Sequence, residues 1–303
     1  MRIFIAGASG AIGRPLVRQL KEAGHDVIGM TRSNAQTLEP LGAEVVVADA
    51  FDGGAVSTAV ANARPDVVVN ELTDLGRPLN PRKYDEWLAG TNKLRRAGTR
   101  NLAVAAAAAG VPKFVSQSVA FAYRMDPGLK TEESPLIGAG AGDMGSAIED
   151  LERETLAAPG GIVLRYGFFY GPRTSYARDG EQIELIRKRQ MPLVGGGTGR
   201  FPFIHIEDAA SATLAAIERG KPGIYNIVDD EPAPGHEYIP FLAQLVGAKK
   251  PRRVPAWAAR LVAGRMVGFA TSLQPVSNET AKRDLGWQLR YPSWRDGFRA
   301  ELG

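Results

Sequence analysis

The sequence predicts an α/β fold built on a doubly wound parallel sheet, and three observations carry this prediction. Short runs rich in Val, Ile and Phe alternate with stretches of helical periodicity through the first half of the chain. These runs lack polar alternation, as strands buried on both faces do. The chain has 303 residues, of which 44% are hydrophobic and 23% charged, which is ordinary for a globular protein of about two domains.

The elements follow one another in the order that a parallel sheet requires. Strands are expected at residues 3–6, 27–30, 44–48, 66–70, 113–117, 161–165 and 223–228. Helices are expected between them at residues 11–23, 34–41, 54–63 and 84–109. Because parallel strands need crossover connections, this order predicts βαβ units with helices on both faces of the sheet.

A glycine loop lies between the first predicted strand and the first predicted helix. It reads Gly-Ala-Ser-Gly-Ala-Ile-Gly over residues 7–13. Glycines at such a junction allow a tight turn, close approach of the backbone to a pyrophosphate, and close packing of helix on strand. The amides and the positive end of the helix dipole then face the phosphates. A Rossmann-type dinucleotide site is therefore expected at Gly7, Ser9, Gly10, Ala11, Ile12 and Gly13.

The pattern changes after residue 166, where Gly and Pro cluster at 171–172, 195–197 and 232–234. We expect a smaller C-terminal substrate domain that interleaves with the first, because the run 223–228 still reads as part of the sheet. The dinucleotide-binding domain is predicted at residues 1–166 plus about 204–230, and the substrate domain at about 167–203 plus 231–303.

The residues after the second predicted strand bear on the choice of cofactor. NAD sites usually carry an acid there, about 20 residues past the glycines. Here Arg32 follows the strand, and Asp26 precedes it and so lies at the wrong end of the sheet. A guanidinium suits a 2′-phosphate. We therefore expect NADP(H) to be preferred, with NAD(H) as the alternative.

Three further segments carry recognisable motifs. They are Leu-Arg-Tyr-Gly-Phe-Phe-Tyr-Gly-Pro at 164–172, Phe-Ile-His-Ile-Glu-Asp at 203–208 and Leu-Gly-Trp at 285–287. With the Gly-x-x-Gly-x-x-Gly spacing of the loop, they resemble the extended short-chain dehydrogenases/reductases, a family also described as NAD-dependent epimerases/dehydratases. The resemblance implies further cofactor contacts at Asp49, Ala50, Glu71, Leu72, Thr73, Ser116, Tyr166, Phe168 and Phe169.

The resemblance also implies a catalytic Ser, Tyr and Lys, with Tyr and Lys four residues apart on one helix. No Tyr in this chain is followed four residues later by Lys. On the helix expected at 143–156, the Tyr position falls on Asp143 or Met144 and the Lys position on Ala147 or Ile148. The usual pair is therefore missing.

Ser118 aligns with the family's catalytic Ser and would polarise a substrate oxygen, unless it only closes a strand. Tyr123, Tyr166 or bound water are the candidate proton donors. Arg95 stands three residues before Gly98, where many relatives carry Asn.

No metal site is expected. His205 and Asp208 stand three apart, but no third ligand has suitable spacing. We expect a structural role for this pair, with Asp208 capping a helix at 209–219.

The leading interpretation is an NAD(P)-dependent oxidoreductase that transfers hydride to or from a small carbonyl or hydroxyl compound. A non-catalytic NADP(H) sensor that binds protein partners, and an epimerase or isomerase with tightly bound cofactor, are the alternatives. With no Cys, disulfides and thiolate chemistry are excluded. Because the charges are spread along the chain, we expect no nucleic-acid partner. Because no run of about 18 successive apolar residues and no leader is seen, we expect a cytoplasmic protein without a membrane partner. A homodimer is left open.

Overall fold

The computed structural model describes residues 1–33, 35–77, 79–80 and 83–303, and a seven-stranded parallel sheet forms its centre. The strand order is β11–β6–β5–β4–β1–β2–β3. From β1 the chain first adds strands on one side of the sheet, β2 and β3, and then on the other side, beginning with β4, so the order of strand addition reverses between β1 and β4. The strands are β1 (Arg2–Ala6), β2 (Asp26–Thr31), β3 (Glu44–Val47), β4 (Val67–Asn70), β5 (Lys113–Val119), β6 (Ile162–Tyr166) and β11 (Gly223–Ile227). The predicted fold class is confirmed. Ligands in such folds bind at the carboxyl ends of strands beside this reversal.

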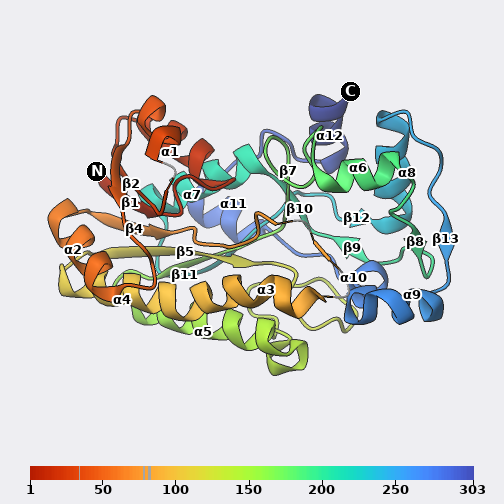
Figure 1. Ribbon diagram of the computed structural model, residues 1–303, viewed down its shortest axis with the longest axis horizontal. Coiled ribbons are helices and arrows are strands. Elements are labelled where there is room, and N and C mark those ends of the chain that lie inside the picture. The colour runs from red at the N-terminus through yellow and green to blue at the C-terminus, as the bar shows by residue number, and fades with distance from the viewer. Residues whose placement is uncertain (34, 78, 81–82) are drawn as a thin grey trace.

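Helices cover both faces of the sheet (Figure 1). One face is covered by α1 (Gly13–Glu22), α7 (Ile206–Arg219) and α11 (Glu279–Leu285). The other is covered by α2 (Gly53–Ala63), α4 (Thr99–Ala108) and α5 (Asp143–Ala157). Helix α3 (Tyr84–Lys93) continues through a π-helical turn (Leu94–Gly98) into α4.

The absence of polar alternation in the strands has a direct structural reason. Ile3 and Ile5 belong to the hydrophobic cluster under α1 and α7, whereas Phe4 between them belongs to the cluster under α2 and α4. Successive side chains of a strand point to opposite faces, so a strand with helices on both sides must be apolar throughout.

A third hydrophobic cluster lies at the end of the molecule away from the N-terminus (Figure 1). It is rich in aromatic side chains, among them Tyr170, Phe203, Trp294 and Phe298. These come from β7 (Phe168–Tyr170), β10 (Phe203–His205) and α12 (Trp294–Leu302), and α6 (Glu181–Arg187) and α8 (Gly235–Leu245) add further side chains to the cluster.

Short elements complete this half of the chain. They are the strands β8 (Leu193–Val194), β9 (Arg200–Phe201), β12 (Ala233–Pro234) and β13 (Arg253–Val254), and the helices α9 (Ala256–Ala263) and α10 (Val267–Ser272). Within the described residues, no helix is both long and apolar enough to cross a bilayer.

Two sequence-based expectations about secondary structure were wrong. Residues 35–41 form two 3₁₀ turns, Ala35–Thr37 and Glu39–Leu41, rather than one α-helix from 34 to 41; Asn34 lies outside the described residues. Pro40 removes an amide donor, and Gly42 ends the second turn at φ 75°. Strands β3 and β11 are edge strands, and β3 is not buried on both faces. An apolar run does not reveal how many strands will pair with it.

A buried ion pair joins α5 to the centre of the sheet. Arg165 of β6 donates from Nε and Nη2 to the two carboxylate oxygens of Glu152, at 2.8 and 2.6 Å. Ser118 of β5 donates to the same carboxylate at 2.7 Å. Nη1 of Arg165 donates to the hydroxyl of Tyr123, which donates in turn to Asn226 of β11. One charge-paired network therefore fixes β5, β6, β11 and α5 in register.

We expect Glu152→Ala to lower the free energy of unfolding by about 3–5 kcal/mol, because it leaves a buried guanidinium without its carboxylate. Glu154→Ala is the matched control, since the ion pair of Glu154 with Arg100 is solvent-accessible and its loss costs about 0.5 kcal/mol or less. Urea denaturation of both variants measures the difference. Equal, small losses would show that the buried pair does not hold α5.

Candidate functional site

The glycine loop lies at the carboxyl edge of the sheet, between β1 and α1. Gly7 has φ 88°, and a Cβ there would stand 2.6 Å from the carbonyl oxygen of Glu71. A Cβ at Gly13 would stand 2.4 Å from the carbonyl oxygens of Gly7 and Ala8. Gly10, in contrast, is exposed. The outer two glycines are therefore required by the fold, and the middle one leaves the surface of the loop open.

The N-terminus of α1 is suited to an anion. No side chain among the described residues caps it, so its first amides have no side-chain acceptor. Arg14 donates from Nε to the carbonyl oxygen of Ser9 at 3.0 Å. Burial, and then the nearby charge of Arg173, lower the pKa of Arg14. Two cations beside an uncapped helix N-terminus favour a bound phosphate.

Most of the predicted cofactor residues share this edge. Ser9 hydrogen-bonds the hydroxyl of Thr31 at 3.1 Å, which ties the loop to the end of β2. Arg32 follows Thr31 and is exposed. Asp49 and Ala50 follow β3, and Leu72 and Thr73 follow β4. Ser116 is different: it is fully buried, and its hydroxyl accepts a hydrogen bond from Asn70 below the edge.

A buried polar trio lies beneath the glycine loop. Tyr166 donates from its hydroxyl to Glu71 at 3.0 Å and shares a hydrogen bond with Thr213 of α7 at 2.6 Å. Burial raises the pKa of Glu71 to about 8, although the hydrogen bond from Tyr166 acts in the opposite direction. Burial also raises the pKa of Tyr166. Both residues support the loop from below, with their polar atoms directed at each other.

The three predicted catalytic hydroxyls are not brought together. Ser118 and Tyr123 belong to the Glu152–Arg165 network on the α5 face of the sheet. The hydroxyl of Tyr166 lies on the α7 face, against Thr213. The pKa of Tyr123 is raised, chiefly by burial and against the effect of Arg165. Each hydroxyl is therefore engaged inside the protein.

The α5 positions predicted for Tyr and Lys carry no proton-transferring group that faces the sheet. Met144 and Ile148 are buried and pack with Leu88 and Val119. Asp143, the other candidate for the Tyr position, is largely exposed and pairs with Arg96 at 2.7 Å. Around this cluster lie half-buried aromatic side chains, namely Tyr84, Trp87, Phe121 and Phe269.

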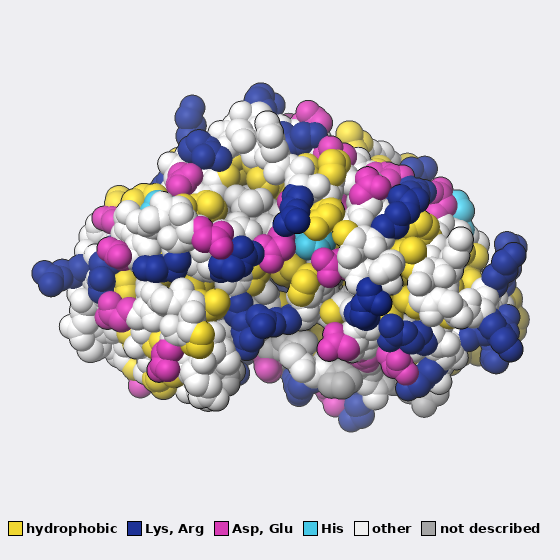
Figure 2. Space-filling model, turned by 90° about the horizontal axis from the view of Figure 1, so that it is seen from above, with side chains coloured by type: hydrophobic (Ala, Val, Ile, Leu, Met, Phe, Trp, Pro, Cys, Tyr) yellow, Lys and Arg dark blue, Asp and Glu magenta, His cyan; other side chains and the backbone are white. Residues whose placement is uncertain are grey.

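The aromatic segment after β6 continues this apolar surface. Phe168 stacks on Phe121 with ring centroids 4.2 Å apart, and Phe169 lies 5.3 Å from Tyr166. Seen from above, the molecule is hollowed between the half that holds α1 and the half that holds α6 and α8, and hydrophobic side chains are visible in the hollow (Figure 2).

Sequence reasoning missed the contribution of α3 to this surface. The hydroxyl of Tyr84 donates to the sulfur of Met144 at 3.5 Å, so a phenol from α3 lies at the α5 position expected for the family's Tyr. The available signal was the spacing of Tyr84, Leu88, Thr91 and Arg95, which places them on one helical face.

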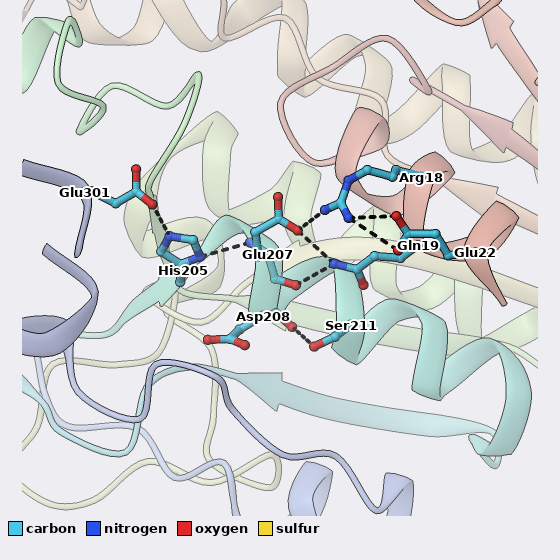
Figure 3. Close-up of polar contacts among 8 residues, drawn as sticks. All are labelled: Arg18, Gln19, Glu22, His205, Glu207, Asp208, Ser211 and Glu301. Carbon is cyan, nitrogen blue, oxygen red and sulfur yellow. Dashed lines mark hydrogen bonds and ion pairs between the residues drawn. The ribbon is translucent and has the colours of Figure 1, made fainter. Parts of the chain in front are cut away.

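His205 has a structural role at the start of α7 (Figure 3). Its Nδ1 accepts the amide of Glu207 at 3.2 Å, and its Nε2 lies 3.2 Å from a carboxylate oxygen of Glu301. Glu207 in turn accepts hydrogen bonds from Arg18 and Gln19 of α1. In the part of the chain that the structure describes, no group of three His, Asp or Glu residues could hold a metal ion.

The predicted capping role of Asp208 was wrong. Helix α7 begins at Ile206, so Asp208 already stands inside its first turn and His205 is the N-cap. The carboxylate of Asp208 instead accepts the amides of Arg290 and Tyr291, at 2.8 and 2.9 Å. It therefore anchors the segment that leads to α12.

Glu71 makes stability depend on pH in a predictable direction. Because its pKa is about 8 in the folded protein, against an ordinary value of 4.5, the folded state keeps a proton that the unfolded chain releases. The wild type should lose stability as pH rises from about 4.5 to about 8. Glu71→Gln cannot ionise, so its stability relative to the wild type should rise by up to about 1.4 kcal/mol per pH unit in that window.

Urea denaturation across the pH range measures this gain, and Glu22→Gln serves as an exposed control. A constant difference between Glu71→Gln and wild type across the window would contradict the assignment.

Comparisons with known proteins agree with this geometry. The model of the NAD dependent epimerase/dehydratase family matches residues 3–228. The chain is 42% identical to a 3-diazoavenalumate denitrifying reductase of a Streptomyces species, over 99% of this chain and 100% of that protein. It is 28% identical to a 2-alkyl-3-oxoalkanoate reductase of Stenotrophomonas maltophilia, over 97% of this chain and 91% of that protein.

Solved structures share the fold. A dTDP-glucose 4,6-dehydratase from Streptomyces venezuelae, solved with NAD and TYD, superposes with a TM-score of 0.81 at 21% identity and covers 100% of this chain and 96% of its own. A human epimerase family protein, solved with NADPH, gives 0.78 at 21% identity, covering 100% and 99%. The chain therefore belongs to the NAD-dependent epimerase/dehydratase family of extended short-chain dehydrogenases/reductases, which confirms the resemblance of its motifs.

Proposed function

We propose that this chain is an NADP(H)-preferring reductase of a small electrophile and works without a protein-borne Tyr–Lys proton donor. The observation that carries the proposal is the α5 face, where buried Met144 and Ile148 stand at positions expected for that pair. Neither of these two side chains can deliver a proton, and the phenol of Tyr84 beside them donates to the sulfur of Met144. A substrate whose reduction needs no proton from the protein suits such a site best.

The glycine loop and the strand ends fit a dinucleotide. The amides of the uncapped α1 N-terminus, with Arg14 and Arg173, would hold the pyrophosphate. Arg32 at the end of β2 would bind a 2′-phosphate, and the residues after β3 and β4 would line the rest of the edge. Once bound, the nicotinamide supplies hydride.

The curated relative at 42% identity suggests the substrate class, because its name describes removal of nitrogen from a diazo compound. An arenediazonium ion that gains one hydride and loses dinitrogen becomes the neutral arene. Electrons and charge balance in this conversion without any added proton. Reduction of a carbonyl, by contrast, creates an alkoxide that must be protonated. The diazo reaction therefore matches an active site whose α5 face is apolar.

The carbonyl substrate expected from the sequence is the second candidate. It is favoured by the relative named as a 2-alkyl-3-oxoalkanoate reductase and by the alignment of Ser118 with the family's Ser. For this role Ser118 would have to give up its 2.7 Å hydrogen bond to Glu152, and Tyr123 its bond to Asn226. This cost favours the diazo substrate.

The proposal predicts NADPH-dependent reduction of benzenediazonium above the rate without protein, with one dinitrogen released per NADPH oxidised. Tyr123→Phe should retain turnover within about threefold, because no proton is drawn from its hydroxyl. Spectrophotometry and gas analysis measure the two products. Turnover of ketones alone, with loss of about a hundredfold or more in Tyr123→Phe, would favour the carbonyl candidate. Binding of NADPH with no turnover of either substrate would favour the sensor.

The cofactor preference has its own test. Arg32→Ala should weaken NADPH binding about tenfold or more and leave NADH binding unchanged, because a charge-assisted contact to the 2′-phosphate is lost. Titration calorimetry measures both affinities, and Arg100→Ala on α4 is the charge-matched control. Tighter binding of NADH than NADPH by the wild type would refute the preference.

A further inference from the structure

Arg95 is a buried cation that pairs with no carboxylate among the residues that the structure describes. Its side chain is 4% exposed. Nη1 donates to the amide oxygen of Asn92 at 3.1 Å, and the enclosed Nε has no partner among the residues that the structure describes. Burial lowers the pKa of Arg95 to about 10, and Tyr84 is the ionisable group that partly offsets this effect. A buried guanidinium with an unpaired N–H group destabilises the fold unless a further group accepts its hydrogen bond and balances its charge.

Arg165 is a second buried guanidinium in this protein, and its partners can be compared with those of Arg95. It is 3% exposed, yet it holds both oxygens of Glu152 and also donates to Tyr123. Near Arg95 the closest carboxylate in the hydrogen-bond chain is Asp143, which binds the far side of the Asn92 amide and pairs with Arg96. Arg165 therefore has a carboxylate partner, whereas Arg95 has none among the described residues.

The surroundings of Arg95 place it at the candidate substrate site. Tyr84, Leu88 and Arg95 lie on one face of the α3–α4 helix, and Tyr84 and Leu88 face the Met144–Ile148 surface of α5. Tyr84 is half-buried and Arg95 is buried, so this face runs from the surface inward. Aromatic rings border its outer part, with Tyr84 and Trp87 stacked at 6.1 Å.

We propose that Arg95 is the substrate anchor, and that it binds the carboxylate of a small aromatic acid whose ring lies against Tyr84 and the apolar face of α5. The proposal rests on the proposed reductase function and names its substrate class. A carboxylate fits the planar fork of a guanidinium and would satisfy the unpartnered Nε. Arg95 is not needed to bind the phosphates of the cofactor, because Arg14, Arg173 and the N-terminus of α1 lie at the glycine loop and would bind them.

Binding without turnover gives the first test. With NADP⁺ present, wild-type protein should bind cinnamate about tenfold or more tighter than cinnamamide, which has the same shape without the charge. Arg95→Gln should abolish this preference and leave cinnamamide affinity within about threefold. Arg95→Lys should keep part of it, because the charge remains and the fork is lost. Arg96→Gln, which loses only pairs with Asp143 and Asp150, is the matched control.

Turnover gives the second test, with 4-carboxybenzenediazonium compared to its carboxamide. The wild type should favour the carboxylate in kcat/KM, and Arg95→Gln should not. Equal binding of cinnamate by wild type and Arg95→Gln, in variants that unfold at similar temperatures, would overturn the anchor even if benzenediazonium is reduced. Arg95-dependent binding of cinnamate with no reduction of any diazonium would support the anchor while the reductase proposal fails.

Discussion

A guanidinium can be buried only at a cost of several kcal/mol unless an anion lies beside it, and this constraint organises the α5 side of the sheet. Glu152 meets the need of Arg165 and thereby fixes α5 against β5 and β6. The position of α5 sets where Met144 and Ile148 face α3. Arg95 is also buried, but no carboxylate among the described residues pairs with it, so a ligand is needed to balance its charge.

The glycine loop depends on a second constraint, which is steric. β1 and β4 lie side by side, so the turn after β1 passes within van der Waals distance of the backbone at Glu71, and any Cβ at Gly7 would collide with it. Glu71 and Tyr166 fill the space below with groups bonded to each other. The loop is therefore held by the fold itself, and its open surface is free to meet a ligand.

Local pattern was enough to predict the sheet and the loop, because apolar runs such as 66–70 and the spacing of Gly7, Gly10 and Gly13 are properties of neighbouring residues. It failed where partners lie far apart in the chain. Tyr123 and Asn226 are 103 residues apart, so nothing local revealed that the hydroxyl proposed as a proton donor was already bonded. The role of Asp208 depended on amides more than 80 residues away.

Relative to the family pattern, the positive charge at the candidate site lies on the α3–α4 helix instead of on α5. The pattern expects a Lys on α5 and an Asn on α3–α4, whereas this chain has Ala147 or Ile148 at the Lys position on α5 and Arg95 on the facing helix. A cation on α5 beside a phenol assists proton transfer. Arg95 on the facing helix donates to Asn92, and the phenol of Tyr84 donates to the sulfur of Met144, so this cation is placed to orient an anionic substrate. The positive charge that assists proton transfer in the family pattern thus serves, as Arg95, to position the substrate. This role is consistent with a reaction that requires no proton from the protein.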